Sequence, residues 1–435
     1  MSWVSAYKLK CDPFGTNDLD ENQLSLIFED RDFEKDAAVN GIRVALDSRK
    51  FGISGLAGVG KTTLLNKIIS ELRSNTLLPI KIDLGQPANE TELLFLFIAH
   101  LLNESQLSLY KKAFSKNTEK IVAEMFDRLY YTIRTESGTT VGISSTISAG
   151  IHALWAKFES KLERKMTKNK ATSKITRPIE GQMAFAEFGN LVRQLREDGV
   201  SVVIGLDEAD KWGADLSKTL INNIKLIITN QHCHVIVVGN STAFSDEMCN
   251  YIVPAHVISI SPFLDPRTGE PSGSLYSIIS KRLEYYALPG EKPAPFDQAT
   301  LAMVFKMSSG VIKTVLSTLS RLFVGLGPEL NGKTIDLPKA FGYLTKAGLV
   351  SRLNEIEQQY VDAMLKIGKP VNPADLVEPL KQRGFDHKTG YVRKRLIAIE
   401  KKGWIKASEG TRVGGRGSAK RYVVQLSTVR NTGTV

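Results

Sequence analysis

The sequence predicts an α/β protein with a doubly wound, five-stranded parallel sheet, followed by a helical lid and a C-terminal winged-helix domain. Three observations predict this fold. Short apolar runs alternate with longer helical patterns from Phe51 onward, a glycine-rich motif follows the first of these runs, and basic residues gather near the C-terminus. The length of 435 residues is sufficient for about two to three domains.

The five expected strands are continuous apolar runs, a pattern typical of strands that are buried on both faces of a parallel sheet. In chain order they are FGIS from Phe51, PIKIDLG from Pro79, SVVIGLD from Ser201, HVIVVGN from His234 and HVISIS from His256. Helical patterns separate these runs, and this alternation favours one parallel sheet with helices on its faces.

We expect three domains along the chain. The α/β core covers residues 1–265, the helical lid residues 266–350 and the winged helix residues 351–435. Two segments with apolar residues at helical spacing, SGSLYSIISKRLEYYA and SSGVIKTVLSTLSRLF, predict the lid. The core carries a long insertion around residues 110–180, whose basic second half is compatible with a nucleic-acid contact and equally with a solvated surface.

The formal net charge of +11 is concentrated in one part of the chain. Residues 351–435 contain 17 Lys/Arg against 8 Asp/Glu, a local excess of +9, which favours a polyanionic partner. A basic surface that only aids solubility is the alternative. The sequence has no apolar stretch near the roughly 20 residues that span a bilayer, so we expect a cytoplasmic protein without a membrane partner.

The run His232-Cys233-His234 has residue types that bind metals. It precedes the apolar run VIVVG, and neighbouring residues of a strand point to opposite faces of the sheet. We therefore expect these residues to be structural, with the cysteines reduced, since none of the three lies in a C-x-x-C pair.

The strongest chemical signal is GLAGVGKT from Gly55 to Thr62, which fits the pattern G-x-x-x-x-G-K-[ST] and lies between an expected strand and the helix TLLNKIISEL. Glycines let backbone N–H groups approach phosphates closely, and the start of the helix adds partial positive charge. Lys61 is expected to reach the β- and γ-phosphates, and Thr62 to place its hydroxyl on Mg²⁺. The expected ATP-binding residues are Gly55, Gly58, Gly60, Lys61, Thr62 and Thr63.

A second signal follows the third expected strand, where the apolar residues VVIGL lead to Asp207 and Glu208. Ligands of open α/β sheets bind at the carboxyl ends of the strands. Asp207 is expected to organise Mg²⁺, and Glu208 to orient or deprotonate the attacking water. An acidic pair after a strand also suits a turn or a helix cap, but its position opposite the glycine motif favours a hydrolytic site.

These motifs resemble those of AAA+ ATPases, in particular the origin-recognition and replication-initiator branch and related prokaryotic ATPases of signalling, transposition and phage defence. The resemblance covers most of the chain and rests on GLAGVGKTT, VVIGLDEAD, VIVVGN, SSGVIKTVL and the C-terminal winged helix. It implies that Asn240 is the sensor-1 residue, which reports the γ-phosphate, although a turn residue would also suit this strand end. It further implies that Lys313 stands near the sensor-2 position, where the family usually has arginine. With Lys61 and Glu208 these residues complete the expected catalytic set.

Two segments depart from the family pattern. Residues 240–262 contain no Arg or Lys, although AAA+ assemblies commonly supply an arginine finger near this strand. Arg267 or Arg282 from the adjoining segment could substitute, or hydrolysis could be slow and act as a switch. Upstream, Ile27 to Glu34 (IFEDRDFE) looks like a degenerate G-R-E box of the initiators and equally like a helix-capping acidic run.

The C-terminal domain is expected to contain three helices, EIEQQYVDAMLKIG, PADLVEPL and KTGYVRKRLIAIEKK, and then two wing strands, WIKASEG and KRYVVQL. The third helix would enter the major groove, as in helix-turn-helix readers, and the glycine-rich wing would contact the backbone or minor groove. The expected DNA contacts are Lys388, Arg393, Lys394 and Arg395 in the helix region and Arg412, Arg416 and Lys420 in the wing. Protein contacts are the alternative use of such a domain.

Taken with the resemblance, these features predict a protein that binds and hydrolyses ATP with Mg²⁺ and whose nucleotide state controls engagement of double-stranded DNA and recruitment of partners. The expected partners include a second copy of the chain and a separate effector protein. Two alternatives stay open: a signalling, transposition or anti-phage defence ATPase that senses DNA, and a transcription regulator switched by ATP.

Overall fold

The computed structural model describes the chain in several ranges. They are residues 3–16, 19–28, 31–45, 47–84, 97, 100–101, 108–122, 124–125, 181–211, 225–240, 244, 252, 256–265, 272–347, 355–367, 369–401, 405–408 and 421–424. The chain forms two compact units. One is Asp30–Ile260, and the other combines Met1–Glu29 with Ser261–Val435. Residues 126–180 of the expected insertion lie outside the described residues.

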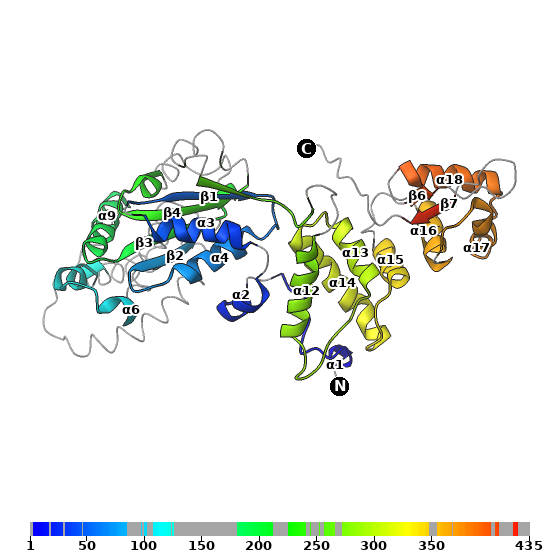
Figure 1. Ribbon diagram of the computed structural model, residues 1–435, viewed down its shortest axis with the longest axis horizontal. Helices are drawn as coiled ribbons and strands as arrows, with labels where there is room; N and C mark the ends of the chain where they lie inside the picture. The colour runs from blue at the N-terminus through cyan, green and yellow to red at the C-terminus, as the bar shows by residue number, and fades with distance from the viewer. Residues whose placement is uncertain are drawn as a thin grey trace, which may run out of the picture. The chain divides into compact units, whose positions relative to one another are not determined.

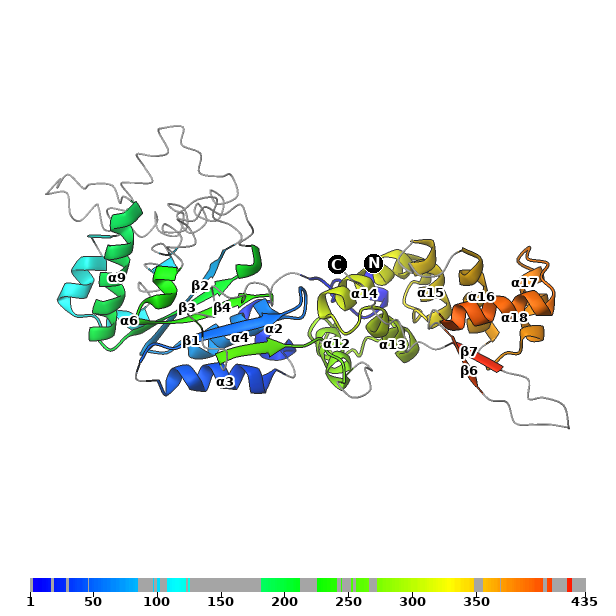
Figure 2. The ribbon, with the colours of Figure 1, turned by 90° about the horizontal axis from the view of Figure 1, so that it is seen from above.

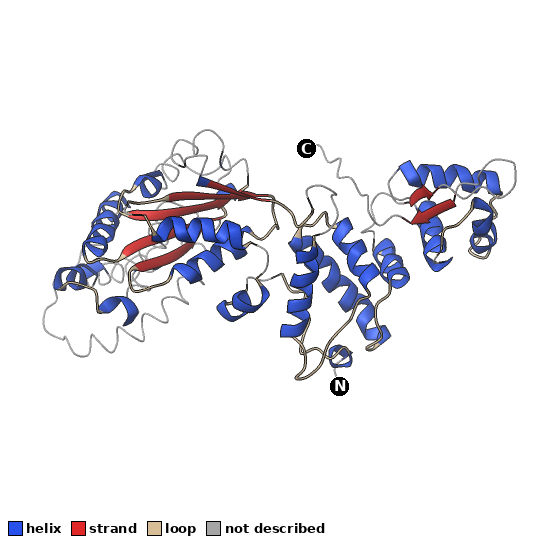
Figure 3. Ribbon diagram, in the orientation of Figure 1, coloured by secondary structure: helices blue, strands red, loops and turns tan. Residues whose placement is uncertain are grey.

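Five parallel strands form the centre of the first unit (Figure 1; strands red in Figure 3). They are β1 (Lys50–Gly55), β2 (Leu77–Asp83), β3 (Ser201–Asp207), β4 (Cys233–Gly239) and β5 (Val257–Ile260), in the order β2-β3-β4-β1-β5. All four strand pairs are parallel. The predicted five-stranded parallel sheet is therefore confirmed.

Helices cover both faces of this sheet, as expected for a doubly wound fold. Val202 and Ile204 of β3 belong to one apolar cluster with residues of α9 (Gly181–Glu197). Gly205 faces the other way, because successive strand residues alternate between faces. A Cβ atom there would lie 2.8 Å from Ile69 Cδ1 of α4 (Lys61–Leu72). Helices α9 and α3 (Asp32–Arg43) also lie on opposite sides of the sheet in Figure 2.

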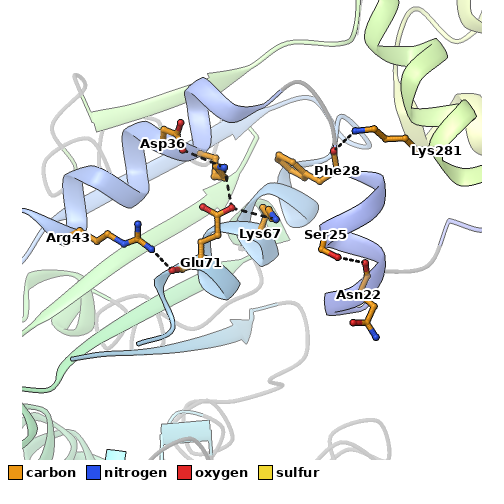
Figure 4. A network of polar contacts seen from close by, with 9 residues as sticks. Asn22, Ser25, Phe28, Asp36, Arg43, Lys67, Glu71 and Lys281 are labelled. Carbon is orange, nitrogen blue, oxygen red and sulfur yellow. Dashed lines mark hydrogen bonds and ion pairs between the residues drawn. The ribbon is translucent and has the colours of Figure 1, made fainter. Parts of the chain in front are cut away.

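Polar contacts fasten α3 to α4 (Figure 4). The ammonium groups of Lys35 and Lys67 lie 3.1 Å and 3.5 Å from Glu71 Oε1, and Arg43 Nη2 donates a hydrogen bond of 2.7 Å to the Glu71 carbonyl oxygen. Because Glu71 lies in the last turn of α4, these contacts position the helix whose first turn follows the glycine-rich loop.

Two short helical elements of the first unit lie near the strands β2 and β3. One is α6 (Ser108–Lys111), in which Tyr110 Oη donates to the Leu77 carbonyl oxygen at 3.0 Å. The other is the 3₁₀ helix η1 (Ala209–Lys211), which begins two residues after β3 ends. The latter turn holds the acidic segment that follows the third strand.

The second unit begins with a helical part that includes the N-terminus of the chain. Its helices are α1 (Trp3–Ala6), α2 (Glu21–Ile27), α12 (Gly273–Tyr285), α13 (Gln298–Met307), α14 (Ile312–Leu330) and α15 (Leu337–Lys346). Aromatic rings join its two chain segments, since the ring centroids of Trp3 and Tyr7 lie 4.9 Å and 5.1 Å from that of Phe323. The N-terminal residues, which the sequence analysis places with the core, thus pack in the second unit. The division into three domains stays a prediction.

The C-terminal part contains helices followed by a two-stranded antiparallel sheet. The elements are α16 (Glu355–Ile367), η4 (Pro373–Leu376), α17 (Val377–Lys381), α18 (Thr389–Lys401), β6 (Ile405–Ser408) and β7 (Arg421–Val424). Backbone hydrogen bonds of 2.8 Å and 2.9 Å join Val371 to Tyr422 of β7. This order of elements agrees with the expected one, and the winged-helix assignment itself stays a prediction. Within the described residues, no helix is long and apolar enough to cross a membrane.

Candidate functional site

The glycine-rich loop lies between β1 and α4, and the geometry at three of its glycines explains the residue type. Gly58 and Gly60 have φ angles of 79° and 96°, values that glycine adopts without the clash that a Cβ atom causes. At Gly55 a Cβ atom would lie 2.6 Å from the Ile260 carbonyl oxygen. The loop conformation therefore requires glycine at these positions.

Helix α4 starts directly after this loop, with Gly60 as its N-cap residue, and glycine has no side chain that could accept from the first N–H groups of the helix. The first N–H groups of a helix lack partners within the helix and carry partial positive charge. Lys61, Thr62 and Thr63 form this first turn and are all half-buried. The start of α4 is thus suited to an anion.

Lys61 extends back over the loop. Its Nζ atom donates to the carbonyl oxygens of Gly55 and Leu56 at 2.9 Å and 3.0 Å. Desolvation by burial lowers the pKa of the ammonium group, and the negative charges of Asp210 and Asp207 oppose this shift. A cation is therefore held at the loop by neutral carbonyl groups, which phosphate oxygens can replace as partners.

Asp207 ends β3 and meets the first turn of α4. Its side chain is 5% exposed. The carboxylate oxygen Oδ1 accepts from Thr62 Oγ1 at 3.3 Å and from the Glu208 backbone N–H at 3.0 Å, while Oδ2 lies 3.2 Å from Lys81 Nζ. The structure therefore brings together the two predicted Mg²⁺ ligands, Thr62 and Asp207. A hydroxyl beside a carboxylate is a set of hard oxygen donors and fits Mg²⁺.

Glu208 follows β3 with a backbone φ of 59°. Positive φ is uncommon for residues other than glycine, and such strain gathers at functional sites. The strained residue stands between Asp207 and η1, at the end of a buried strand. This position agrees with the predicted catalytic glutamate, whose role stays a prediction.

The other two predicted catalytic residues lie in different units. Asn240 is half-buried and directly follows β4, which pairs with both β1 and β3. The register pairs Ser54 with Gly239, so Asn240 lies at the sheet edge where the glycine-rich loop begins. Lys313 lies in the first turn of α14 in the second unit. The sensor roles of Asn240 and Lys313 stay predictions.

Two basic residues of the first unit lie close to the loop and to Asp207: Arg31, from the segment that resembles a degenerate G-R-E box, and Lys81, to which the sequence analysis gives no role. Arg31 is buried, its Nη2 atom donates to the Val59 carbonyl oxygen at 3.4 Å, and its Nη1 atom lies 3.4 Å from Glu34 Oε1. Arg31, the N-cap residue of α3, thus contacts the glycine-rich loop. Lys81, which pairs with Asp207, is a lysine within an apolar strand. Such a residue needs a partner, and this was the signal that could have revealed it.

Arg282, one of two suggested arginine fingers, has partners within its own unit. It is buried, and its Nη1 atom donates to the carbonyl oxygens of Pro13 and Gly15 at 2.8 Å and 2.9 Å. Reaching a nucleotide would break both bonds, so a structural role suits this residue better. Arg267 lies outside the described residues.

The DNA-contacting residues predicted for the third C-terminal helix lie in α18 or directly before it. Lys388, Arg393 and Lys394 are exposed, and Arg395 is half-buried. The Nε and Nη2 atoms of Arg395 donate to Tyr391 Oη at 3.0 Å and 2.6 Å, one helical turn away. The predicted wing contacts Arg412, Arg416 and Lys420 lie outside the described residues.

Cys233 and His234 are both buried in β4. Burial raises the pKa of the Cys233 thiol to about 11 and lowers the pKa of His234 to about 4. His234 Nδ1 accepts from the Arg49 backbone N–H at 3.0 Å. Within the described part of the chain, no group of three His, Cys, Asp or Glu residues is arranged to hold a metal ion.

Comparison with known families adds an independent observation to this geometry. Residues 44–243 match the KAP family P-loop domain. The matched segment is a little under half of the chain and includes β1 to β4, the glycine-rich loop and Asp207. The first unit thus has the P-loop NTPase fold. No curated protein matches the sequence.

Several solved structures are similar to the chain at low sequence identity. The Aeropyrum pernix ORC1 protein in complex with DNA shares 14% identity, with 93% of this chain and 91% of that chain covered and a TM-score of 0.42. Drosophila ORC bound to DNA shares 12% identity, with 98% of this chain and 90% of that chain covered and a TM-score of 0.41. The Walker-type ATPase PABY2304 of Pyrococcus abyssi shares 13% identity, with 95% of this chain and 97% of that chain covered and a TM-score of 0.38. All three TM-scores lie below 0.5.

Proposed function

We propose that this P-loop NTPase binds and hydrolyses ATP with Mg²⁺ and that the state of the nucleotide controls how its C-terminal part engages double-stranded DNA. The observation that supports the enzymatic part is the contact of Thr62 with Asp207, 3.3 Å apart, at the start of α4. The loop places Lys61 next to the same helix start. One small region therefore combines backbone N–H groups and a cation for phosphates with oxygen ligands for a metal.

In this proposal each residue has a distinct role. The N–H groups at the start of α4 hold the phosphates, and Lys61 exchanges its two carbonyl partners for β- and γ-phosphate oxygens. Thr62 and Asp207 would hold Mg²⁺, which when bound neutralises charge that develops on the phosphates. Glu208 orients or deprotonates the attacking water, and Asn240 senses the γ-phosphate from the neighbouring strand.

The DNA-binding part rests on charge and exposure. The segment after residue 350 carries an excess of +9, and Arg393 and Lys394 of α18 are open to solvent, as is Lys388 just before this helix. Exposed cations on and beside one helix are suited to the phosphates and base edges of a duplex. The wing residues Arg412 and Arg416 would add contacts beside this helix.

One experiment tests the coupling directly. The affinity of a labelled DNA duplex is measured by fluorescence anisotropy with Mg·ADP, with a slowly hydrolysed ATP analogue and without nucleotide. Because coupling between two sites is reciprocal, calorimetry should show the same factor when the nucleotide affinity is measured with and without DNA. Equal DNA affinities in all three states would refute the switch while leaving nucleotide binding intact.

An initiator-like protein, a DNA-sensing signalling or defence ATPase and an ATP-switched transcription regulator would all use ATP hydrolysis linked to DNA binding. A second copy of the chain and a separate effector protein stay proposed partners.

A further inference from the structure

Lys81 is a basic residue at the proposed metal site with no role in the mechanism above. It lies in β2, and the parallel register pairs it with Gly205 of β3. Paired residues of neighbouring strands share a face of the sheet, and so do residues two apart in one strand. Lys81, Gly205 and Asp207 therefore lie on one face.

The contact between Lys81 and Asp207 is direct. The Lys81 Nζ atom lies 3.2 Å from Asp207 Oδ2. The Lys81 side chain is 27% exposed, whereas that of Asp207 is 5% exposed. The ammonium group thus belongs to the more exposed side chain of the pair.

The charge balance at Asp207 explains the value of this contact. A buried carboxylate is costly unless a cation or several hydrogen bonds compensate it. Thr62 Oγ1 and the Glu208 N–H are neutral donors to Oδ1, and the Lys61 ammonium is bonded to loop carbonyls instead. Lys81 therefore supplies a full positive charge beside Asp207 Oδ2, whereas the two neutral donors bond to Oδ1.

We infer that Lys81 is a built-in counter-ion of Asp207 that competes with Mg²⁺ and so sets the metal affinity of the site. This inference rests on the proposed function, because Asp207 must be the metal-organising residue. A divalent cation at this carboxylate meets a positive charge 3.2 Å from Oδ2, which weakens binding of the metal. The nucleotide phosphates then become necessary partners for the metal, and free Mg²⁺ is excluded from the empty site.

The test compares nucleotide affinity with and without metal, so it does not depend on activity. The dissociation constant of a fluorescent ADP analogue is measured in EDTA and in saturating Mg²⁺. The constant in EDTA divided by the constant in Mg²⁺ reports how strongly the metal supports binding of the nucleotide. In Lys81→Met this ratio should rise by about tenfold, because the variant removes the repulsion between one positive charge and the metal. Lys81→Arg keeps the cation and should leave the ratio near that of the natural protein.

Two further variants separate this role from a general effect on folding. Lys50 is also a half-buried strand lysine, but its Nζ atom donates to the carbonyl oxygens of Asn230 and Cys233 at 2.7 Å. Lys50→Met should therefore leave the ratio unchanged. In an Asp207→Asn background, Lys81→Met should also have no effect, since the charge with which it pairs is gone. Lys81→Gln replaces Lys81→Met if the latter does not fold, as judged by thermal unfolding.

The outcomes are distinct. If the natural protein shows a clear metal dependence and Lys81→Met leaves the ratio unchanged or lowers it, the inference is overturned and the proposed function stands. If the natural protein binds no ADP analogue in Mg²⁺, both are overturned. A rise in the ratio that also occurs in Lys50→Met would show a general effect of removing a lysine and would overturn the specific role of Lys81.

Discussion

His234 provides a quantitative prediction about stability in acid. The residue is 5% exposed, and burial together with the charges of Lys50, Arg196 and Arg49 lowers its pKa from 6.5 to about 4. A group with a lower pKa in the folded state binds protons more readily when unfolded, so its contribution is complete above pH 6.5 and is lost as the pH falls toward 4. Each pH unit in this window should lower the free energy of unfolding by at most about 1.4 kcal/mol, and by less close to either pKa.

The assay is urea unfolding of the natural protein and of His234→Asn at several pH values. Asparagine places an acceptor oxygen where Nδ1 accepts from the Arg49 N–H at 3.0 Å, and it does not titrate. Between pH 6.5 and pH 5.5 the natural protein should lose about 1 kcal/mol more than the variant, because the unfolded histidine is already half protonated at pH 6.5. Parallel pH profiles for the two proteins would refute this account of His234, whatever carboxylates do at lower pH.

Three further predictions concern the proposed activity. Lys61→Ala should abolish detectable nucleotide binding in calorimetry, because the loop loses the cation that meets the phosphates; binding at natural affinity would contradict the loop assignment. Glu208→Gln should bind ATP but hydrolyse it at least about 100-fold more slowly, the lower end of the usual contribution of a general base, and unchanged turnover would remove the catalytic role. Replacing both Arg393 and Lys394 by alanine should lower DNA affinity for every duplex tested and reduce the slope of log affinity against log salt by about 2, whereas an unchanged slope would place the DNA elsewhere.

Much of the first unit could be predicted because its signals are local. Each strand is a continuous apolar run, and the loop motif specifies the conformation at Gly58 and Gly60 within a few residues. The meeting of Thr62 with Asp207 could also be expected, since the carboxyl ends of parallel strands share one edge. These inferences needed only short segments and the rules of one fold class.

What could not be predicted depends on contacts between distant segments. The packing of Trp3 and Tyr7 against Phe323 joins residues more than 300 positions apart, and an apolar pattern does not tell which surface it will cover. Lys81 is similar, because only the register with Gly205 shows that its side chain can reach Asp207. The positive φ of Glu208 likewise has no signature in residue types.

Because Met1–Glu29 and Ser261–Val435 belong to one unit, the P-loop NTPase domain is inserted into the sequence of that unit. The chain passes between the two units twice. If the inserted domain unfolds, residues 30–260 become one long loop, and both ends of this loop stay attached to the folded helical unit. Closing a loop costs entropy that grows only slowly with its length. The helical unit can therefore remain folded while the inserted domain opens, and mechanical or thermal denaturation should proceed in two separable steps.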